Sequence, residues 1–328
     1  MKEFFKNILK KLRIDFSKNS KLIYYIKSSW IYFSPKFLYS EKLLNTYRNM
    51  SEKERELITN RVNYYNQLNE QFNLDQNTIT VNDFIRKEKK KTYFFDLLEY
   101  LKYFHYNNKI SYLFGDITTV PTIPTIVKSR PINEDNQNSI IMKLNKVRHF
   151  IFINDKINFK DKLNKAVWRG KCYVEHRQHF VQKFYNKEFC NIGQVNTKGK
   201  IDVPWQKTKL SLQEQLQYKF LIAIEGNDVA SNLKWAMSSN SLVIMAKPKY
   251  ETWFMEGTLI ENYHYVLVKD DYSDLEIKID YFSKNINEAE EIINNAHKYI
   301  KKFQIVEHEN VISYLVLDKY FKKSFSKD

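Results

Sequence analysis

Residues 218–245 constrain the fold of this chain more than any other stretch. The short apolar run 220–224 has the length and composition of a buried strand, and it stops at Glu225-Gly226. Small and polar residues follow, then a segment with helical spacing, then a second apolar run at 241–245. This order predicts a strand, a glycine turn, a helix and a strand. Such a unit places a helix start at the carboxyl edge of a parallel sheet, where α/β proteins bind phosphorylated ligands, although a unit without a ligand has the same pattern.

Further strands and helices alternate along the chain, which favours a parallel α/β sheet in the C-terminal half. Strands are expected at 111–116, 140–144, 150–153, 167–170, 189–193 and 264–268, and helices at 94–104, 176–185 and from about 275 to the end. Ser51-x-x-Glu54 is a capping box that predicts a helix start. The polar segment 155–165 marks the expected domain boundary. The predicted division is 1–50 as a basic, aromatic helical region, 51–165, 166–305, and 306–328 as a C-terminal helix or tail.

Charge and cysteine content narrow the function. The 328 residues suit two domains, and 53 Lys and Arg against 38 Asp and Glu give a net charge of +15. That excess predicts an anionic partner: nucleic acid, anionic lipid or a phosphorylated substrate. Two cysteines make a disulfide framework improbable. No HExxH, CxxC, Walker or GxGxxG pattern is present, so we expect neither a metal nor a dinucleotide cofactor. No apolar run reaches the length of a membrane span.

The N-terminal region has two possible surface functions. Residues 1–16 place Phe5, Ile8, Leu9 and Leu12 on one helical face among lysines, a pattern typical of helices that lie on anionic membranes. The same pattern suits a helix packed on its own domain. Aromatic residues interleaved with lysines through residue 50 also suit single-stranded nucleic acid, so a nucleic-acid-binding protein is an alternative.

Three features could carry chemistry. Asp116 follows an apolar strand and Gly115, where a carboxylate can accept a proton from an attacking hydroxyl, although turn aspartates are common. Arg169-Gly170 and Arg177 offer a guanidinium grip for phosphate, or else surface ion pairs. The helix start after Gly226 could hold a diphosphate. A base in one half, a phosphate grip in the other and a cleft between them form the layout of a two-domain glycosyltransferase.

Several segments also resemble a known family, in order along residues 50–300. They are 114–118, 120–121, 127–132, 143–150, 167–170, 225–235, 239–241 and 264–266. Through them the chain resembles glycosyltransferase family 90, which includes bacterial lipopolysaccharide core transferases of the LpsA type and eukaryotic protein O-glucosyltransferases. No single segment is specific, but the set is.

The resemblance implies a GT-B fold, with two Rossmann-like domains facing across a cleft and extra N-terminal helices. It implies an inverting transfer from a nucleotide sugar, usually a UDP-sugar, without an essential metal or other cofactor. Asp116 matches the family's catalytic base. Residues 51–165 would form the acceptor side with this base, and residues 166–305 would bind the donor.

The resemblance also assigns the donor contacts. It places the family's arginine-glycine motif on Arg169 and Gly170 and a donor-binding arginine on Arg177. The segment 226–234 would line the pyrophosphate and nucleotide, with Gly226, Asn227, Asp228, Ser231, Asn232 and Lys234 as its candidate contacts. Eukaryotic members carry an arginine where this chain has Asn232, which cannot neutralise a diphosphate. Lys234, Arg177 or the helix dipole would then carry more of that task, and the difference points to the bacterial branch.

An anionic glycan or glycolipid acceptor, most simply a lipopolysaccharide core, would suit the +15 charge. On this interpretation the protein is cytoplasmic and peripheral at the inner face of the cell membrane, which residues 1–16 would contact, and it binds no nucleic acid. An inactive transferase fold kept as an interaction module is the remaining alternative.

Overall fold

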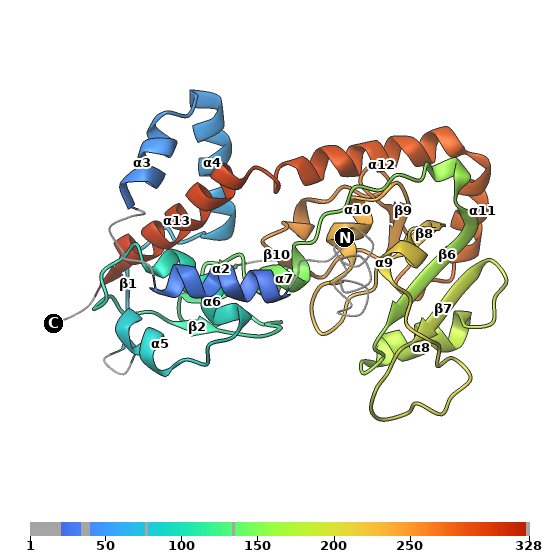
Figure 1. The fold of residues 1–328 in the computed structure, drawn as a ribbon, viewed down its shortest axis with the longest axis horizontal. Helices are drawn as coiled ribbons and strands as arrows, with labels where there is room; N and C mark the ends of the chain where they lie inside the picture. Colours follow the sequence, from blue (N-terminus) through green and yellow to red (C-terminus); the bar gives the residue numbers. More distant parts are fainter. Residues whose placement is uncertain (1–20, 34–39, 76–77, 133–134, 326–328) are drawn as a thin grey trace, which may run out of the picture.

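The computed structural model describes residues 21–33, 40–75, 78–132 and 135–325. The expected amphipathic helix at residues 1–16 lies outside this part of the chain. The described residues form a mixed α/β fold with several parallel sheets (Figure 1). None of the described helices is both long and apolar enough to cross a bilayer.

The C-terminal half contains a five-stranded parallel sheet, as the alternation of elements predicts. Its strand order is β11-β9-β8-β6-β7. The strands are β6 (Leu163–Gly170), β7 (Cys190–Gln194), β8 (Tyr218–Ile222), β9 (Leu242–Met245) and β11 (Val266–Leu267). The central strands β8 and β9 are apolar because both faces of the sheet are covered, and Phe220 and Leu242 are fully buried. The helices of this half are α8 (Glu175–Phe184), α9 (Leu212–Gln215), α10 (Leu233–Met237), α11 (Leu275–Lys284) and α12 (Ile286–Lys301).

The N-terminal half contains a smaller parallel sheet of order β2-β3-β5. Its strands are β2 (Tyr112–Leu113), β3 (Thr125–Val127) and β5 (Ser139–Ile141), and β4 (Ser129–Pro131) follows β3 directly. The helices around it are α2 (Lys21–Phe33), α3 (Ser40–Arg48), α4 (Glu52–Tyr65), α5 (Val81–Lys87), α6 (Thr92–Leu101) and α7 (Lys146–His149), with a 3₁₀ turn η2 (Phe159–Asp161) before β6. Helix α4 begins at the predicted capping box, in which Ser51 and Glu54 exchange hydrogen bonds.

Two expectations about local structure are wrong. Residues 150–153 form no strand and follow α7 instead. They are apolar because they pack against the core, and the backbone N–H of Ile153 donates to Ser238 Oγ at 3.0 Å, so no ladder is needed there. The helix after Gly226 is also shorter and later than expected, because α10 begins only at Leu233.

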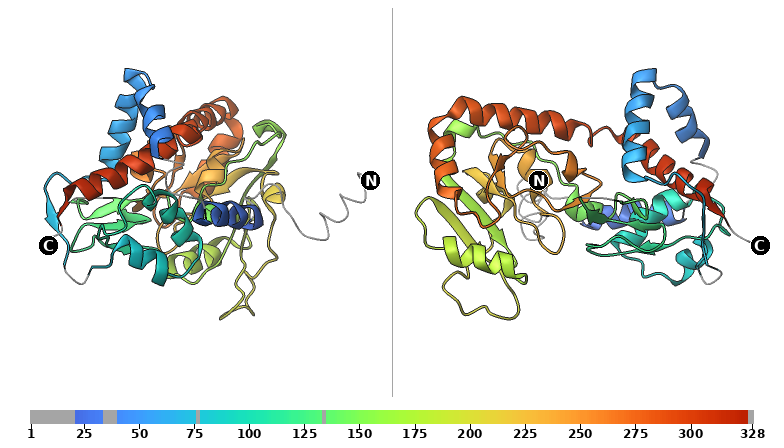
Figure 2. Two further views of the ribbon diagram at one scale, coloured as in Figure 1. Left: turned by 60° about the vertical axis from the view of Figure 1, so that its left-hand side comes forward. Right: turned by 180° about the vertical axis from the view of Figure 1, so that it is seen from behind.

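The two halves contact each other at several places besides the chain connection near residue 160. Strand β10 (Tyr250–Thr252), which a second 3₁₀ turn η3 (Glu256–Thr258) follows, pairs antiparallel with β4 of the N-terminal half. Helix α13 (Val306–Lys323) returns and packs against α4 and α3, and β12 (Ser324–Phe325) pairs with β1 (Phe72–Asn73) (Figures 1 and 2). One buried apolar cluster includes Ile58, Ile141, Val243 and Leu317. The boundary at 165 therefore stays a prediction, and residues 306–325 belong with the N-terminal half.

Candidate active site

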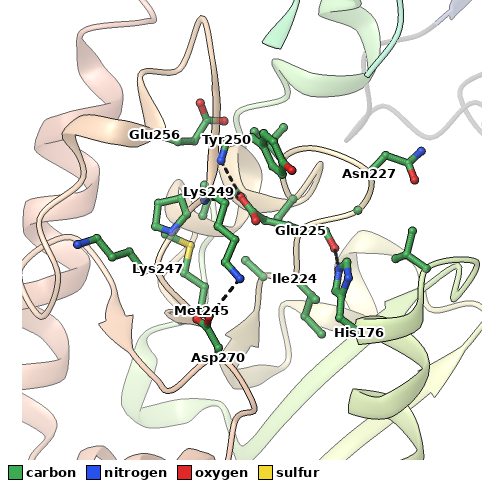
Figure 3. A pocket seen from close by; sticks show the side chains of 18 of the residues that line it. His176, Ile224, Glu225, Asn227, Met245, Lys247, Lys249, Tyr250, Glu256 and Asp270 are labelled. Carbon is green, nitrogen blue, oxygen red and sulfur yellow. Dashed lines mark hydrogen bonds and ion pairs between the residues drawn. The ribbon is translucent and has the colours of Figure 1, made fainter. Parts of the chain in front are cut away.

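A pocket of about 610 Å³ lies where β8 and β9 end, at the carboxyl edge of the larger sheet. Its wall includes Glu225 and Asn227 after β8 and Lys249 and Tyr250 after β9 (Figure 3). Asp116 and Thr118 of the N-terminal half also line it. The pocket is thus built from both halves, at the sheet edge that the order of elements predicts.

Asp116 stands at the junction of the two halves. It follows Gly115, whose φ of 118° lies in the region that favours glycine, because other residues would be strained there. Its Oδ2 accepts a hydrogen bond from Asn227 Nδ2 at 3.2 Å, and its Oδ1 lies 2.5 Å from Lys128 Nζ. Burial alone would raise the pKa of Asp116, but the hydrogen bond and charge of Lys128 outweigh it and lower the pKa. The carboxylate is therefore ionised at neutral pH and can accept a proton.

Lys128 links this carboxylate to a second one. Its Nζ also lies 2.6 Å from Asp228 Oδ2, and the lysine side chain is only 2% exposed. Burial alone would lower the pKa of Lys128, but the charge of Asp228 and the hydrogen bond to Asp116 raise it. A buried ammonium thus connects Asp116 of one half with the loop after β8 of the other.

Glu225 forms part of the pocket wall. Its Oε1 accepts hydrogen bonds from the backbone N–H groups of Lys249 and Tyr250 at 3.0 and 3.2 Å (Figure 3). Burial raises the pKa of Glu225 to about 7, and the nearby Glu256 adds to the rise. Glu225 is thus a carboxyl group beside the pocket that changes charge near neutral pH.

We expect the Glu225→Gln variant to be more stable than the parent at pH 8 and about equally stable at pH 5. A carboxyl group whose pKa is raised in the folded state binds its proton more tightly there, so stability falls as the pH rises from the unfolded value near 4.5 through about 7. Glutamine removes that loss and keeps an acceptor oxygen. Thermal unfolding of both proteins from pH 5 to pH 8 measures the difference in their stability. The same difference at every pH would contradict the prediction.

Arg177 holds the loop after β8, which lines the pocket. Its guanidinium donates to the carbonyl oxygens of Glu225 (2.8 Å), Ile224 (2.6 Å) and Lys171 (3.1 Å). A Cβ at Gly226 would lie 3.3 Å from Arg177 Nη2, so glycine lets the loop pass close to the arginine. Arg177 is not part of the pocket wall. Its observed contacts are those of a residue that orders the loop after β8.

Arg169 and Gly170 also lie outside the pocket wall. The Arg169 guanidinium donates to backbone oxygens of Thr208, Trp168 and Asn191 and to the Asn191 side chain. Gly170 packs so closely that a Cβ there would lie 2.4 Å from the Trp168 ring. Both residues have a visible role in packing β6.

Three of the candidate contacts that follow Asn227 are likewise bonded to other groups of the protein. Asp228 pairs with Lys128, and Asn232 Nδ2 donates back to Ile222 O at 2.9 Å. Lys234 is fully buried, pairs with Glu256 and lies 5.2 Å from the centre of the Phe254 ring. Ser231, Asn232 and Lys234 are absent from the pocket wall. The charge of Lys234 is already matched, so this lysine does not suit the diphosphate-neutralising task expected of it.

Sequence reasoning missed Lys128 and Glu225 as site residues, although both lie in segments that carry the family resemblance. It also missed Arg148, an exposed cation from 143–150 whose charge helps to lower the pKa of Asp116. Within the described ranges, no three His, Cys, Asp or Glu side chains are grouped so as to hold a metal ion.

An ionised carboxylate in the wall of a pocket at the edge of a parallel sheet suits an enzyme that activates a hydroxyl group for group transfer. Comparison with known proteins gives the family. The family model described as "Glycosyl transferase family 90" matches residues 137–324. The chain is 42% identical over 267 residues to the O-glucosyltransferase LpsA of Dichelobacter nodosus, and this match covers 81% of this chain and 83% of that protein. It is 32% identical over 114 residues to the uncharacterized protein 179R of Invertebrate iridescent virus 6, and this match covers 32% of this chain and 9% of that protein.

The chain therefore belongs to glycosyltransferase family 90, and it is a glycosyltransferase.

Proposed function

We propose that this enzyme transfers a hexose or pentose from a UDP-sugar to a hydroxyl group of a glycan acceptor, with inversion and without a metal. The observation that carries the proposal is the hydrogen bond from Asn227 to Asp116, which brings the two halves together at the pocket. On this proposal the halves act as the two facing domains of a GT-B enzyme, with the donor held by the C-terminal half.

In the proposed reaction the donor lies in the pocket with its anomeric carbon towards Asp116. Asp116 takes the proton of the acceptor hydroxyl as that oxygen bonds to the anomeric carbon. The bond from the anomeric carbon to the phosphate oxygen breaks on the opposite face, and UDP leaves with the electron pair. One displacement of this kind inverts the anomeric centre.

The loop after β8 supports a diphosphate position. Among the described residues, the backbone N–H groups of Asn227, Val229 and Ala230 have no hydrogen-bond partner, and all three residues line the pocket. They are available to an anionic ligand, as loop N–H groups are in other phosphate sites. Arg177 supports this binding indirectly, because it fixes the carbonyl groups on which the loop rests.

A panel of UDP-sugars tests the function directly. Because the Dichelobacter relative is named an O-glucosyltransferase, we expect UDP-glucose to release UDP fastest, ahead of UDP-galactose and UDP-xylose. Release of UDP by the purified protein is measured with each donor, alone and with a lipopolysaccharide core oligosaccharide as acceptor. No release above background from any donor, with or without the acceptor, would contradict the proposal.

The proposed acceptor is the core of lipopolysaccharide or lipooligosaccharide, which is anionic like the partner that the +15 charge predicts. Access to a lipid-borne acceptor would place the enzyme at the cytoplasmic face of the membrane. Residues 1–16 remain a proposed contact with that surface.

We expect Arg177→Ala to weaken UDP-sugar binding by about tenfold or more, because hydrogen bonds from a charged group to three carbonyl oxygens are lost and the donor loop is no longer held. Calorimetric titration with UDP, which shares the diphosphate and nucleotide of the donor, measures the dissociation constant. Arg169→Ala is the matched control, since it removes a comparable set of backbone hydrogen bonds away from the pocket. Equal affinities for UDP in the parent and in Arg177→Ala would remove Arg177 from the donor site.

A further inference from the structure

Helix α2 exposes an apolar stripe along its length. Its five members are each between 61% and 81% exposed: Leu22, Ile23, Ile26, Trp30 and Phe33. Their positions follow i, i+1, i+4, i+8 and i+11, so they fall within roughly 100° of the helix circumference. A soluble monomer seldom leaves so many large apolar side chains together in water, and a cluster of this kind marks a binding surface.

The stripe is not the result of a detached helix, because the opposite face of α2 is anchored. The Tyr24 hydroxyl donates to Asp96 Oδ1 at 2.7 Å, and it lies 3.0 Å from the carbonyl oxygen of Thr92. Ser28 is buried, and Lys102 Nζ donates to the carbonyl oxygen of Ile31. Helix α2 thus lies along α6 (Figure 1). Its polar anchors contact α6 and the residue after it, and its apolar stripe is exposed.

The charges around the stripe identify its partner. Helix α2 contains no acidic residue, and its two lysines, Lys21 and Lys27, are exposed. Five of the six residues 86–91 are basic, and Lys90 of this run donates to the Tyr32 hydroxyl at 3.0 Å. Apolar residues, interfacial aromatics and flanking lysines are the composition of helices that lie in the surface of an anionic bilayer.

Other partners fit less well. A nucleic acid would pair with the lysines but would leave Leu22 and Ile26 in water. A second copy of this chain, also at +15, would bring like charges together. An anionic lipid surface matches both the apolar stripe and the lysines of the same helix and of the run 86–91 that contacts it.

We infer that α2 is a membrane-docking helix, which inserts this stripe into the headgroup boundary of an anionic bilayer while Lys21, Lys27 and the basic run 86–91 contact lipid phosphates. The helix lies in the plane of the surface and does not cross the bilayer. This inference concerns a different segment from residues 1–16, and it does not depend on which sugar the enzyme transfers.

Vesicle binding by the full chain tests the inference. The parent is mixed with vesicles of phosphatidylethanolamine and phosphatidylglycerol, and bound protein is measured by sedimentation. We expect the triple variant Leu22→Ser, Ile26→Ser, Phe33→Ser to bind these vesicles at least about tenfold more weakly, because three apolar side chains no longer leave water. We expect the parent to bind neutral phosphatidylcholine vesicles weakly.

The matched control replaces exposed apolar residues elsewhere, Ile277→Ser and Tyr281→Ser on α11, and is expected to bind vesicles like the parent. A variant that lacks residues 1–16 distinguishes the two candidate membrane segments. We expect this deletion variant to bind vesicles, and we expect the binding to be lost when the three serine substitutions are added to it. Transfer to a soluble acceptor should be the same in the triple variant as in the parent, so a failure of docking is distinguishable from a failure of the proposed chemistry.

Three results would overturn the inference. The first is vesicle binding by the triple variant equal to that of the parent. The second is conversion of a parent dimer to a monomer in the triple variant, since the stripe would then bind a second copy. The third is a clear loss of thermal stability in the triple variant, since the stripe would then be covered by the chain's own N-terminal segment.

Discussion

The Asp116→Asn variant is expected to lose about 10²–10⁴-fold in transfer rate, which is the usual contribution of a general base, while it binds UDP as tightly as the parent. Asparagine has nearly the same shape but cannot take the acceptor proton. Sugar transfer is measured with the donor that the UDP-sugar panel selects, and UDP affinity is measured by calorimetry. The same variant distinguishes an active transferase from an inactive fold kept as an interaction module.

Asn227→Ala is the control for this prediction. It removes the 3.2 Å hydrogen bond to Asp116 but leaves the carboxylate ionised by Lys128, so we expect a much smaller loss of rate. Transfer by Asp116→Asn at the parent rate would exclude Asp116 as the base, and it would leave the family assignment unaffected.

The Lys128→Met variant is expected to have the largest effect on stability, a loss of about 3–5 kcal/mol in the free energy of unfolding, because Asp228 would be left buried without its cation. The variant should also need a higher pH for activity. Lys128 is the cation that most lowers the pKa of Asp116, and without it the Asn227 amide and Arg148 would lower that pKa less. Denaturant unfolding and the pH dependence of the transfer rate measure the two effects.

The direction in which the pH profile of the transfer rate shifts follows from the lowered pKa of Asp116 in the parent. Because the folded pKa of Asp116 lies below its unfolded value, its stabilising contribution is present above about pH 4 and is lost as the pH falls through the folded pKa. Without Lys128, the acid limb of the rate profile moves to higher pH. Adding Asp228→Asn should restore much of the stability and leave the pH shift in place. Lys128→Arg keeps the charge and should show little shift, and an unchanged acid limb in Lys128→Met would contradict the prediction.

The sequence predicts the larger sheet well. Strands β8 and β9 contain short apolar runs, and β6 and β7 each combine buried apolar residues with a glycine. It fails at 150–153, where residues are apolar because they pack against the core without pairing. Periodicity and composition report burial, and they do not distinguish a paired segment from an unpaired one.

The candidate site is predictable in outline only. Asp116 and the loop after β8 were expected to meet, and Asn227 does contact Asp116. Lys128 could not be found in this way, because a lysine is normally exposed and its burial depends on two carboxylates distant in sequence. Arg169 and Lys234 have the charge that a donor site needs. Their partners, backbone oxygens and Glu256, are visible only after folding.

The return of α13 to the N-terminal half affects the order in which the protein can fold. This helix contributes Val316 and Leu317 to the core around Ile58 and Val62. It is made after every strand of the β2-β3-β5 sheet and of the five-stranded sheet. The N-terminal half therefore cannot complete its core while the ribosome is still making the C-terminal half. During that interval the newly made α4 would expose its apolar face, so a chaperone that holds the nascent N-terminal half should raise the yield of folded enzyme.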